Sequence, residues 1–136
     1  MSLSPVHGGL DVPVDRMLKL SRRKSLEAEA QGMPSITVVK ADLATVYRLA
    51  DGTLSPLTGP MNEEQFNLVL DEKVVLSNGK KYAWTIPLSL PLTDAEAAAL
   101  KVGGMAALRD ESGELVGVLE VQSVFDWDKV RYVKSI

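Results

Sequence analysis

A loop rich in turn-forming residues constrains how this chain can fold. Residues 50–61 read ADGTLSPLTGPM and lie between two helix-like stretches. Gly52 is a natural stop for the first helix, and Asn62 is suited to cap the second. Between them, Pro56 and Pro60 follow serine and glycine, so each pair turns the chain. The loop therefore predicts a short, fixed connection between two helices.

The same loop contains two apolar residues, Leu57 and Met61, that need a surface to pack on. Each turn former already has a mechanical task, which favours a role in scaffolding and docking over ligand capture. We therefore regard Leu57 and Met61 as candidate interface residues.

Capping patterns predict several short helices. Asn62 with Gln65, and Thr93 with Glu96, each match the capping-box spacing. The predicted helices cover residues 15–31, 42–51 (with Asp42 as the N-cap), 62–73 and 93–103, with a short final element capped by Asp128.

Alternating and β-branched stretches predict strands between these helices. Residues 35–40 form one strand, and Asn78-Gly79 predicts a hairpin that joins residues 74–76 to a strand over 82–90. Pro87 places that second strand at an edge or breaks it. A further hairpin turns at residues 110–113 and returns over 115–125, and a short extended piece is expected near residues 10–14.

Hairpins with short inserted helices favour an α+β fold with a bent sheet or small open barrel. The chain has 136 residues, the size of one domain, and carries no repeat or interdomain linker. We therefore expect a single domain over residues 1–136.

Composition excludes several kinds of site. The chain has no cysteine and one histidine, so disulfides, thiolate chemistry and cysteine- or histidine-rich metal centres are ruled out. The net charge of −3 disfavours nucleic-acid binding. The basic residues Lys19, Arg22, Arg23 and Lys24 are followed by glutamates and are best interpreted as a solvated helix face. With no membrane span or signal-peptide pattern, we expect a cytoplasmic protein.

No set of side chains forms a nucleophile and base. His7, Gly8 and Gly9 resemble a phosphate-binding nest, but the segment lacks the lysine of a P-loop. These three residues are candidates for an interface or an anion contact. Trp84 and Trp127 are interpreted as core or interface anchors. The residues alone predict no catalytic, cofactor-binding or metal-binding residue.

Four motifs occur in a fixed order: SPVHGGL, ADGTLSPLTGPM, YAWTIPLSLPL and LKVGGMAALRDESGELVGVLEVQSVFDWDK. This set resembles the N-terminal domain of ATP sulfurylase (sulfate adenylyltransferase), which carries P-H-G-G, G-x-x-S-P-L-x-G-F-M, W-x-I-P-I-x-L and a hairpin leading to D-K. The resemblance runs from His7 to Lys129. Pro60 stands where the family has phenylalanine.

The resemblance implies a PUA-like bent-sheet pseudobarrel with short inserted helices. It also implies a parent enzyme of sulfur metabolism, in sulfate assimilation or in dissimilatory use, and a nucleotidyltransferase that moves the adenylyl group of ATP to sulfate and uses Mg²⁺. The family's catalytic motifs, Q-x-R-N-x-x-H and G-R-D-H, do not occur in this sequence. The resemblance therefore implies a scaffold without its own cofactor, partnered by a catalytic domain in cis or in trans, and able to form a homo-oligomer.

Two alternatives stay open at this point. PUA-like folds often bind RNA, and the cluster Lys19–Lys24 is a candidate for phosphate contacts. A small-anion module built on His7, Gly8 and Gly9 is the other.

Overall fold

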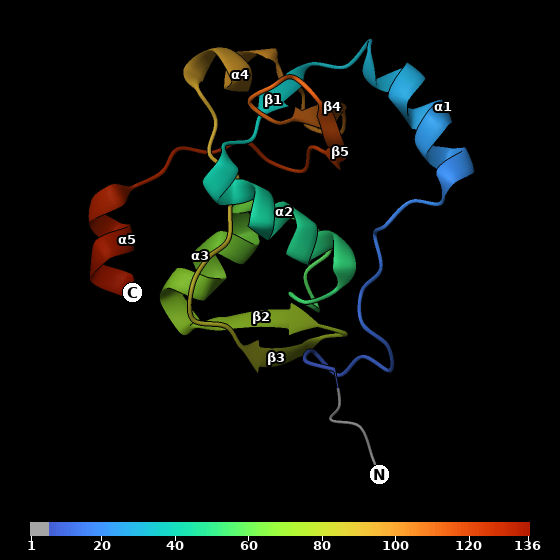
Figure 1. Ribbon diagram of the computed structural model, residues 1–136. Helices are drawn as coiled ribbons and strands as arrows, with labels where there is room; N and C mark the ends of the chain where they lie inside the picture. The colour runs from blue at the N-terminus through green and yellow to red at the C-terminus, as the bar shows by residue number, and fades with distance from the viewer. Residues whose placement is uncertain (1–5) are drawn as a thin grey trace. The chain divides into compact units, whose positions relative to one another are not determined.

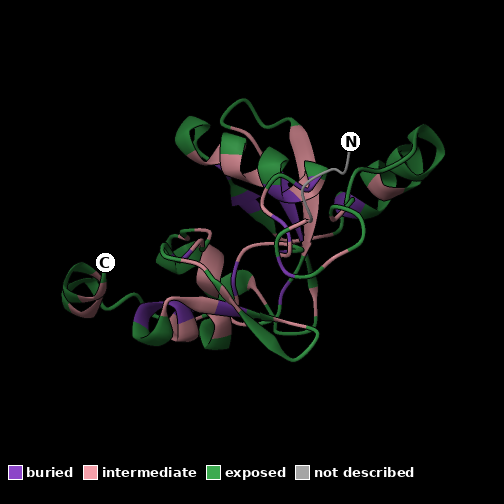
Figure 2. Ribbon diagram, turned by 90° about the horizontal axis from the view of Figure 1, so that it is seen from below, coloured by how far each residue is buried: buried purple, intermediate pink, exposed green. Residues whose placement is uncertain are grey.

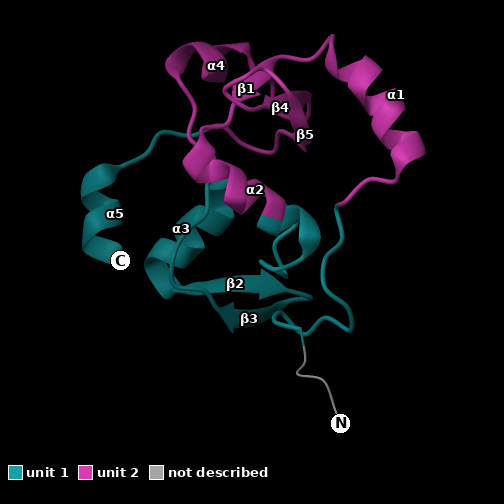
Figure 3. Cartoon of the chain, in the orientation of Figure 1, with its two compact units in different colours: residues 1–16, 48–89, 125–136 teal, residues 17–47, 90–124 magenta. Residues whose placement is uncertain are grey.

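The computed structural model describes residues 6–136 as a mixture of short helices and strands (Figure 1). In chain order the elements are α1 (Leu20–Ala30), β1 (Ser35–Thr37), α2 (Lys40–Asp51), α3 (Glu63–Glu72), β2 (Val74–Ser77), β3 (Lys80–Ala83), α4 (Asp94–Ala99), β4 (Met105–Arg109), β5 (Leu115–Glu120) and α5 (Lys129–Ser135). The described residues divide into two compact units, coloured separately in Figure 3. Unit 1 holds residues 6–16, Arg48–Ser89 and Phe125–Ile136, and unit 2 holds Met17–Tyr47 and Leu90–Val124.

Unit 1 contains the β2–β3 hairpin, α3 and α5. The two strands are antiparallel, and the turn between them consists of Asn78 and Gly79. Both turn residues have positive φ angles, 51° and 75°, as the tight turn of a two-residue hairpin requires. The predicted Asn-Gly hairpin is therefore confirmed.

Helix α3 begins with the predicted capping box. The side chain of Asn62 accepts a hydrogen bond from the Gln65 N–H at 2.9 Å, and the Gln65 side chain accepts one from the Asn62 N–H at 3.0 Å. These bonds satisfy two backbone donors that the helix itself leaves unpaired. Helix α3 ends at Glu72, and its C-cap residue Lys73 has a left-handed φ of 59°.

The core of unit 1 lies against α3. Phe66, Val69 and Leu70 point into it, and the side chain of Val69 is completely buried. The buried cluster consists of Leu49, Leu57, Met61, Phe66, Val69, Leu70 and Val75. Full burial of a side chain of this size contributes about 1.5–3 kcal/mol. The cluster is therefore what holds the hairpin and the loop of residues 52–61 on one helix.

Unit 2 is built on a three-stranded sheet in the order β1-β4-β5. Strand β1 is parallel to β4, and β5 is antiparallel to β4. Its buried cluster consists of Ile36, Val38, Ala106, Leu108 and Val121. Ala107 is buried as well, so three successive residues of the central strand β4 are buried and both of its faces are covered.

Two glutamates join elements of unit 2 that are far apart in the sequence. Glu96, in α4, accepts hydrogen bonds from the backbone N–H of Thr93 at 3.0 Å and of Thr37 at 2.7 Å. Glu111, in the turn after β4, accepts one from the backbone N–H of Lys40 at 3.0 Å. Lys40 is the first residue of α2, so Glu111 caps that helix from a distant turn.

The α+β prediction is confirmed, with differences in where elements begin and end. Within residues 6–136 the strands form two separate sheets and no closed barrel. Helix α1 begins at Leu20, not near residue 15, because the Arg16 N–H is bonded to the Ala50 carbonyl at 2.8 Å. Helix α2 begins at Lys40, so the prediction of Asp42 as its N-cap was wrong, and α4 ends at Ala99, short of residue 103.

The strand expected over residues 35–40 ends at Thr37, since α2 begins at Lys40. Two further predicted strands are also too long. The strand expected over residues 82–90 ends at Ala83, and the rest of that stretch is held by Met61, whose N–H donates to the Leu88 carbonyl at 2.7 Å. The strand expected over 115–125 ends at Glu120, because Val121 pairs with the loop at Gly103 and Gly104. Both differences arise from partners that lie far away in the sequence.

The hydrogen bonds of Glu96 make the stability of unit 2 depend on pH. Burial disfavours the charged carboxylate, but the bonds from the Thr93 and Thr37 N–H groups outweigh this and lower the pKa of Glu96 below its usual 4.5. A lowered pKa in the folded state adds stability above the unfolded value, and this stability is lost as the pH falls through the folded value. We expect Glu96→Gln to reduce the free energy of unfolding by about 0.5–1 kcal/mol at pH 7, a small effect because the group stays largely solvated.

Denaturant unfolding of the two proteins at several pH values measures this difference. The gap between them is expected to narrow steadily as the pH falls below 4.5. A gap of constant size from pH 7 to pH 3 would contradict the assignment.

Candidate functional site

The His-Gly-Gly segment forms a tight turn in unit 1. Val6 and Leu10 pair across it as an isolated antiparallel bridge, and Gly8 and Gly9 at its tip have φ angles of 90° and 71°. Only glycine adopts such angles without strain. The two glycines therefore set the shape of the turn.

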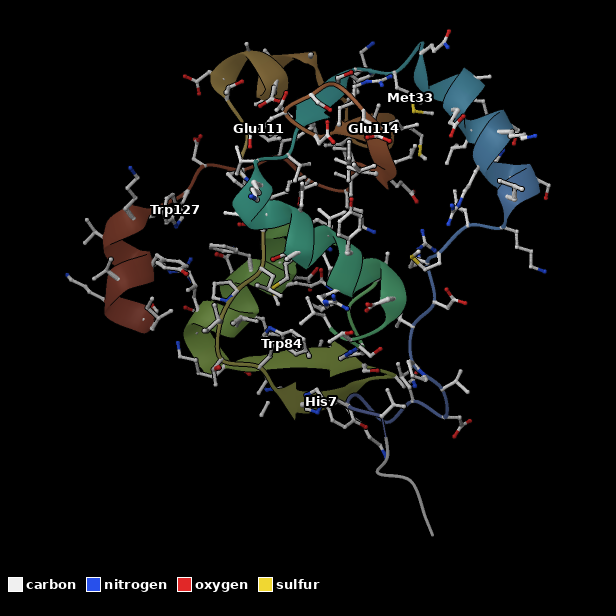
Figure 4. The ribbon with its side chains drawn as sticks, in the orientation of Figure 1. His7, Met33, Trp84, Glu111, Glu114 and Trp127 are labelled. Carbon is white, nitrogen blue, oxygen red and sulfur yellow. The ribbon has the colours of Figure 1, made fainter. Side chains whose placement is uncertain are left out.

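His7 extends from this turn to the end of β3, as Figure 4 shows. Its Nε2 lies 2.9 Å from the carbonyl oxygen of Ala83, so this nitrogen carries the proton and donates. The imidazole ring meets the ring of Tyr82 edge-on at 5.7 Å and lies 6.0 Å from the ring of Trp84. His7 therefore donates a hydrogen bond to β3 and packs in an aromatic group with Tyr82 and Trp84.

The glycines of the turn also allow a close approach to two other segments. A Cβ atom added to Gly8 would lie 2.5 Å from the Pro56 ring, and one added to Gly9 would overlap the Tyr82 hydroxyl. Pro56 belongs to the loop of residues 50–61, and Tyr82 to β3. Three motifs that are separate in the sequence thus meet at this turn.

The two apolar loop residues lie in the core of unit 1. Leu57 and Met61 are each 3% exposed and belong to the buried cluster on α3. The Met61 sulfur also accepts a hydrogen bond from the Leu88 N–H at 3.4 Å. In this structure both side chains face their own unit, and their assignment to an interface with another molecule stays a prediction.

A shallow apolar depression lies beside the aromatic group. It has a volume of about 390 Å³ and is lined by Leu54, Ala83, Trp84, Thr85, Ile86 and Leu88. Ile86 is 55% exposed at its edge. The Trp84 indole N–H is already bonded to the Ile86 carbonyl at 2.9 Å. A depression with this lining suits an apolar partner surface better than a phosphate group.

The carboxylates with displaced pKa values serve turns and caps. The Thr53 hydroxyl donates to Asp51 at 2.6 Å and, with the Thr53 N–H, lowers the pKa of Asp51. In the turn between β4 and β5, the Ser112 hydroxyl likewise donates to Asp110 and lowers the pKa of this carboxylate. Among residues 6–136, no group of three or more histidine and acidic side chains could hold a metal ion.

The remaining candidates lie at the surface. Trp127 is 55% exposed, with the Lys129 Nζ 5.5 Å from the centre of its ring. On α1, the basic side chains are exposed, and Arg22 pairs with Glu29 at 2.9 Å. In the part of the chain that the structure describes, no helix is long and apolar enough to cross a bilayer.

Comparison with known proteins places this fold. A family model described as "PUA-like domain" matches residues 4–136. The chain belongs to the PUA-like domain family. The fold that the motifs implied is therefore confirmed.

Curated relatives of this PUA-like chain are named sulfate adenylyltransferase. One from Pyropia yezoensis is 47% identical over 135 residues, which are 99% of this chain and 31% of the relative. One from Synechococcus sp. (strain JA-3-3Ab) is 34% identical over 132 residues, 97% of this chain and 32% of the relative. The chain thus spans about a third of the length of these relatives. The resemblance to ATP sulfurylase is confirmed for the part of these relatives that this chain matches.

A solved structure is also similar. The hexameric APS kinase from Thiobacillus denitrificans matches with a TM-score of 0.77 and 28% identity, over 91% of this chain and 24% of that one. In this comparison too, the PUA-like chain corresponds to a small part of a larger polypeptide.

His7, Gly8 and Gly9 do lie together, but the residues that they touch were not predicted as their partners. Pro56 was expected only to turn the chain, and Tyr82 was not singled out. Both belong to motifs that carried the family resemblance. The order of the motifs was the available signal that these segments meet.

Substitution of Gly8 tests whether the close approach to Pro56 matters beyond the backbone angle. Gly103 is a matched control, because its φ of 86° is close to the 90° of Gly8 but no atom lies within 4 Å of an added Cβ. We expect Gly103→Ala to cost about 1 kcal/mol from backbone strain. Gly8→Ala adds the overlap with Pro56 and is expected to cost about 2–4 kcal/mol.

The midpoint of thermal or urea unfolding measures both variants. Equal losses for Gly8→Ala and Gly103→Ala would show that the contact with Pro56 contributes nothing.

Proposed function

We propose that this chain is the N-terminal PUA-like domain of an ATP sulfurylase and supplies support and an interface, not catalysis. The parent enzyme transfers the adenylyl group of ATP to sulfate, giving adenosine 5′-phosphosulfate and pyrophosphate, with Mg²⁺ on the phosphates. The observation that carries the proposal is the match to sulfate adenylyltransferases over 99% of this chain but only 31% of the relative.

The His-Gly-Gly turn supports a structural role. His7 donates to a backbone carbonyl, Gly8 lies against a proline ring and Gly9 against a tyrosine hydroxyl. The hydrogen bond from the imidazole Nε2 to the Ala83 carbonyl ties β3 to the turn. The turn joins segments of unit 1, which is the task of a scaffold.

The proposal includes the partner and the setting. The catalytic domain lies in cis or in trans, and residues 1–136 act as one domain because the family match runs through both compact units. Assembly into a homo-oligomer is in line with the hexameric APS kinase that has a similar fold. ATP and Mg²⁺ belong to the catalytic domain, and we place the assembly in the cytoplasm and in sulfate assimilation.

An RNA- or anion-binding module is the alternative function. The exposed basic residues of α1 favour it, but Arg22 is paired with Glu29 and the chain carries a net charge of −3. RNA binding at low salt that weakens steeply as salt rises would support this alternative. Sulfate binding that His7→Ala abolishes would support the anion version. We expect neither.

Pyrophosphate release tests the support role directly. With ATP, Mg²⁺ and sulfate, the purified chain is expected to release pyrophosphate at least about 10³-fold more slowly than an intact sulfate adenylyltransferase, because an active site of this kind accelerates its reaction by far more than that. The relative from Pyropia yezoensis, 47% identical over the shared region, is the positive control.

Omission of sulfate is the second control in this assay. Sulfate-dependent release by the chain alone, at a rate near that of the relative, would overturn the support role. Release that does not depend on sulfate would identify a contaminating ATPase.

A further inference from the structure

Helix α1 of unit 2 carries a serine directly after a short basic run. Residues 22–26 read RRKSL, so Arg22 and Arg23 stand three and two positions before Ser25, and Leu26 follows it. No other serine or threonine of the sequence has arginines at both of these positions. The buried clusters of the two units contain none of these residues, so core packing does not explain their arrangement.

The hydroxyl of Ser25 lies beside the guanidinium group of Arg22. The Arg22 Nη1 donates to the Ser25 Oγ at 3.0 Å and to the Glu29 Oε1 at 2.9 Å. All three residues are exposed, and the ribbon of α1 is coloured mainly as exposed in Figure 2. Because residues three, four and seven apart share a face of a helix, the hydroxyl lies between a cation and an anion.

The ends of α1 are poorly stabilised. Its N-cap residue, Lys19, makes no side-chain cap bond, and the helix has no acidic residue in its first turn and no basic residue in its last turn. The helix dipole is therefore uncompensated at both ends. Among the eleven residues that the structure describes in α1, Ala30 alone is buried. A helix of this length depends on packing or caps, so we expect α1 to open locally at little cost.

An opened α1 presents a charge pattern that suits a basophilic protein kinase. Kinases select their substrates in part by the charges that flank the reacting hydroxyl. A guanidinium group pairs with a carboxylate through two parallel hydrogen bonds, so two successive arginines before the serine select an acidic peptide groove. The acids of the helix, Glu27 and Glu29, follow the serine and do not meet the part of the groove that binds the arginines.

We propose that Ser25 is a phosphorylation site for a serine/threonine kinase with an acidic peptide groove, and that its phosphate takes Arg22 from Glu29. In the transfer, the Ser25 oxygen bonds to the γ-phosphorus of ATP while the bond from that phosphorus to the bridging oxygen breaks. ADP leaves with the electron pair, and the hydroxyl proton passes to the catalytic carboxylate of the kinase. The phosphate attracts Arg22 more strongly than the single charge of Glu29 does, and it repels Glu29 one turn further on.

Phosphorylation at this position cancels the positive charge of α1. Four basic and two acidic side chains lie within residues 19–30. A phosphoserine carries a charge of about −1.5 to −2 at pH 7, which removes this surplus. The modification is therefore a switch for the surface charge of one helix.

Treatment of the 136-residue chain with a kinase tests the site. The chain is incubated with ATP, Mg²⁺ and the catalytic subunit of cyclic-AMP-dependent protein kinase, and mass spectrometry of proteolytic fragments locates the phosphate. We expect one phosphate, on Ser25, and none on the Ser25→Ala variant. Arg22→Gln/Arg23→Gln is expected to lower kcat/KM of the kinase at least about 100-fold, since both arginines lose charge-assisted bonds to the groove.

Matched controls separate recognition from charge and from folding. Lys19→Gln/Lys24→Gln removes the same charge from the same helix and is expected to change kcat/KM less than about threefold. Ser21 is also exposed on α1 but has no arginine two or three positions before it, so it is expected to stay unmodified. These exposed variants are expected to melt within a few degrees of the unsubstituted protein.

A peptide of residues 18–31 is the reference for an open helix. The folded chain is expected to reach a kcat/KM within about 100-fold of that of the peptide, because opening of α1 costs little.

Magnetic resonance of the Arg22 Nε–Hε group tests the exchange of partners. In the unphosphorylated chain, Glu29→Gln removes the partner of Arg22 and is expected to shift this signal. In the phosphorylated chain the same substitution is expected to leave the signal in place, because the phosphate holds Arg22. Glu27→Gln removes the other acid of α1, which in the described structure is not paired with Arg22, and is the control expected to shift the signal in neither state.

Several results would overturn the proposal. The chain is not a site of this kind if Ser25 takes no phosphate, or takes it equally well without the two arginines. A kcat/KM more than about 100-fold below that of the peptide shows that α1 stays closed to the kinase. An equal shift on Glu29→Gln before and after phosphorylation shows that Arg22 stays with Glu29 and that the phosphate does not act as proposed.

Discussion

The hydroxyl of Ser55 is the interaction on which the candidate site of unit 1 depends. Ser55 is 5% exposed, donates to the Gly52 carbonyl at 2.6 Å and accepts from the Val14 N–H at 2.9 Å. One buried side chain thus joins the segment 6–16 to the turn after α2. A buried hydroxyl without these partners would be costly. The next residue, Pro56, is the one that Gly8 touches, so the position of the His-Gly-Gly turn follows from this bond.

Local chemistry could be predicted from the sequence, and distant pairing could not. The capping boxes at Asn62 and Thr93, the Asn78-Gly79 turn and the Asp128 cap depend on residues within four positions, and all are confirmed. Strand lengths depend on partners far away in the chain. Alternation over residues 82–90 resembles a strand, but Leu88 pairs with Met61 instead of continuing the β2–β3 hairpin. No periodicity encodes that choice.

In the candidate site too, the local residues could be predicted but their distant contacts could not. His7, Gly8 and Gly9 could be selected because His7 is the one histidine of the sequence and two successive glycines let backbone amides converge, as in a phosphate-binding nest. Their contacts with Tyr82 and Pro56 needed the three-dimensional structure, since 70 or more residues separate His7 from β3. The apolar character of Leu57 was evident from the sequence, but the direction of its side chain was not. It faces the core on α3, which no pattern within the loop determines.

Polar groups and apolar groups differ in how far the chain satisfies them. In the part of the chain that the structure describes, no buried side-chain nitrogen or oxygen lacks a hydrogen-bond partner. The carboxylates of Asp51 and Asp110, whose pKa values are lowered, accept hydrogen bonds within their own turns. Some apolar side chains, in contrast, stay exposed: Ile86 at the depression, and the valines of α5. Exposed apolar surface gains free energy only when another surface covers it, and the proposed supporting role would provide such a surface.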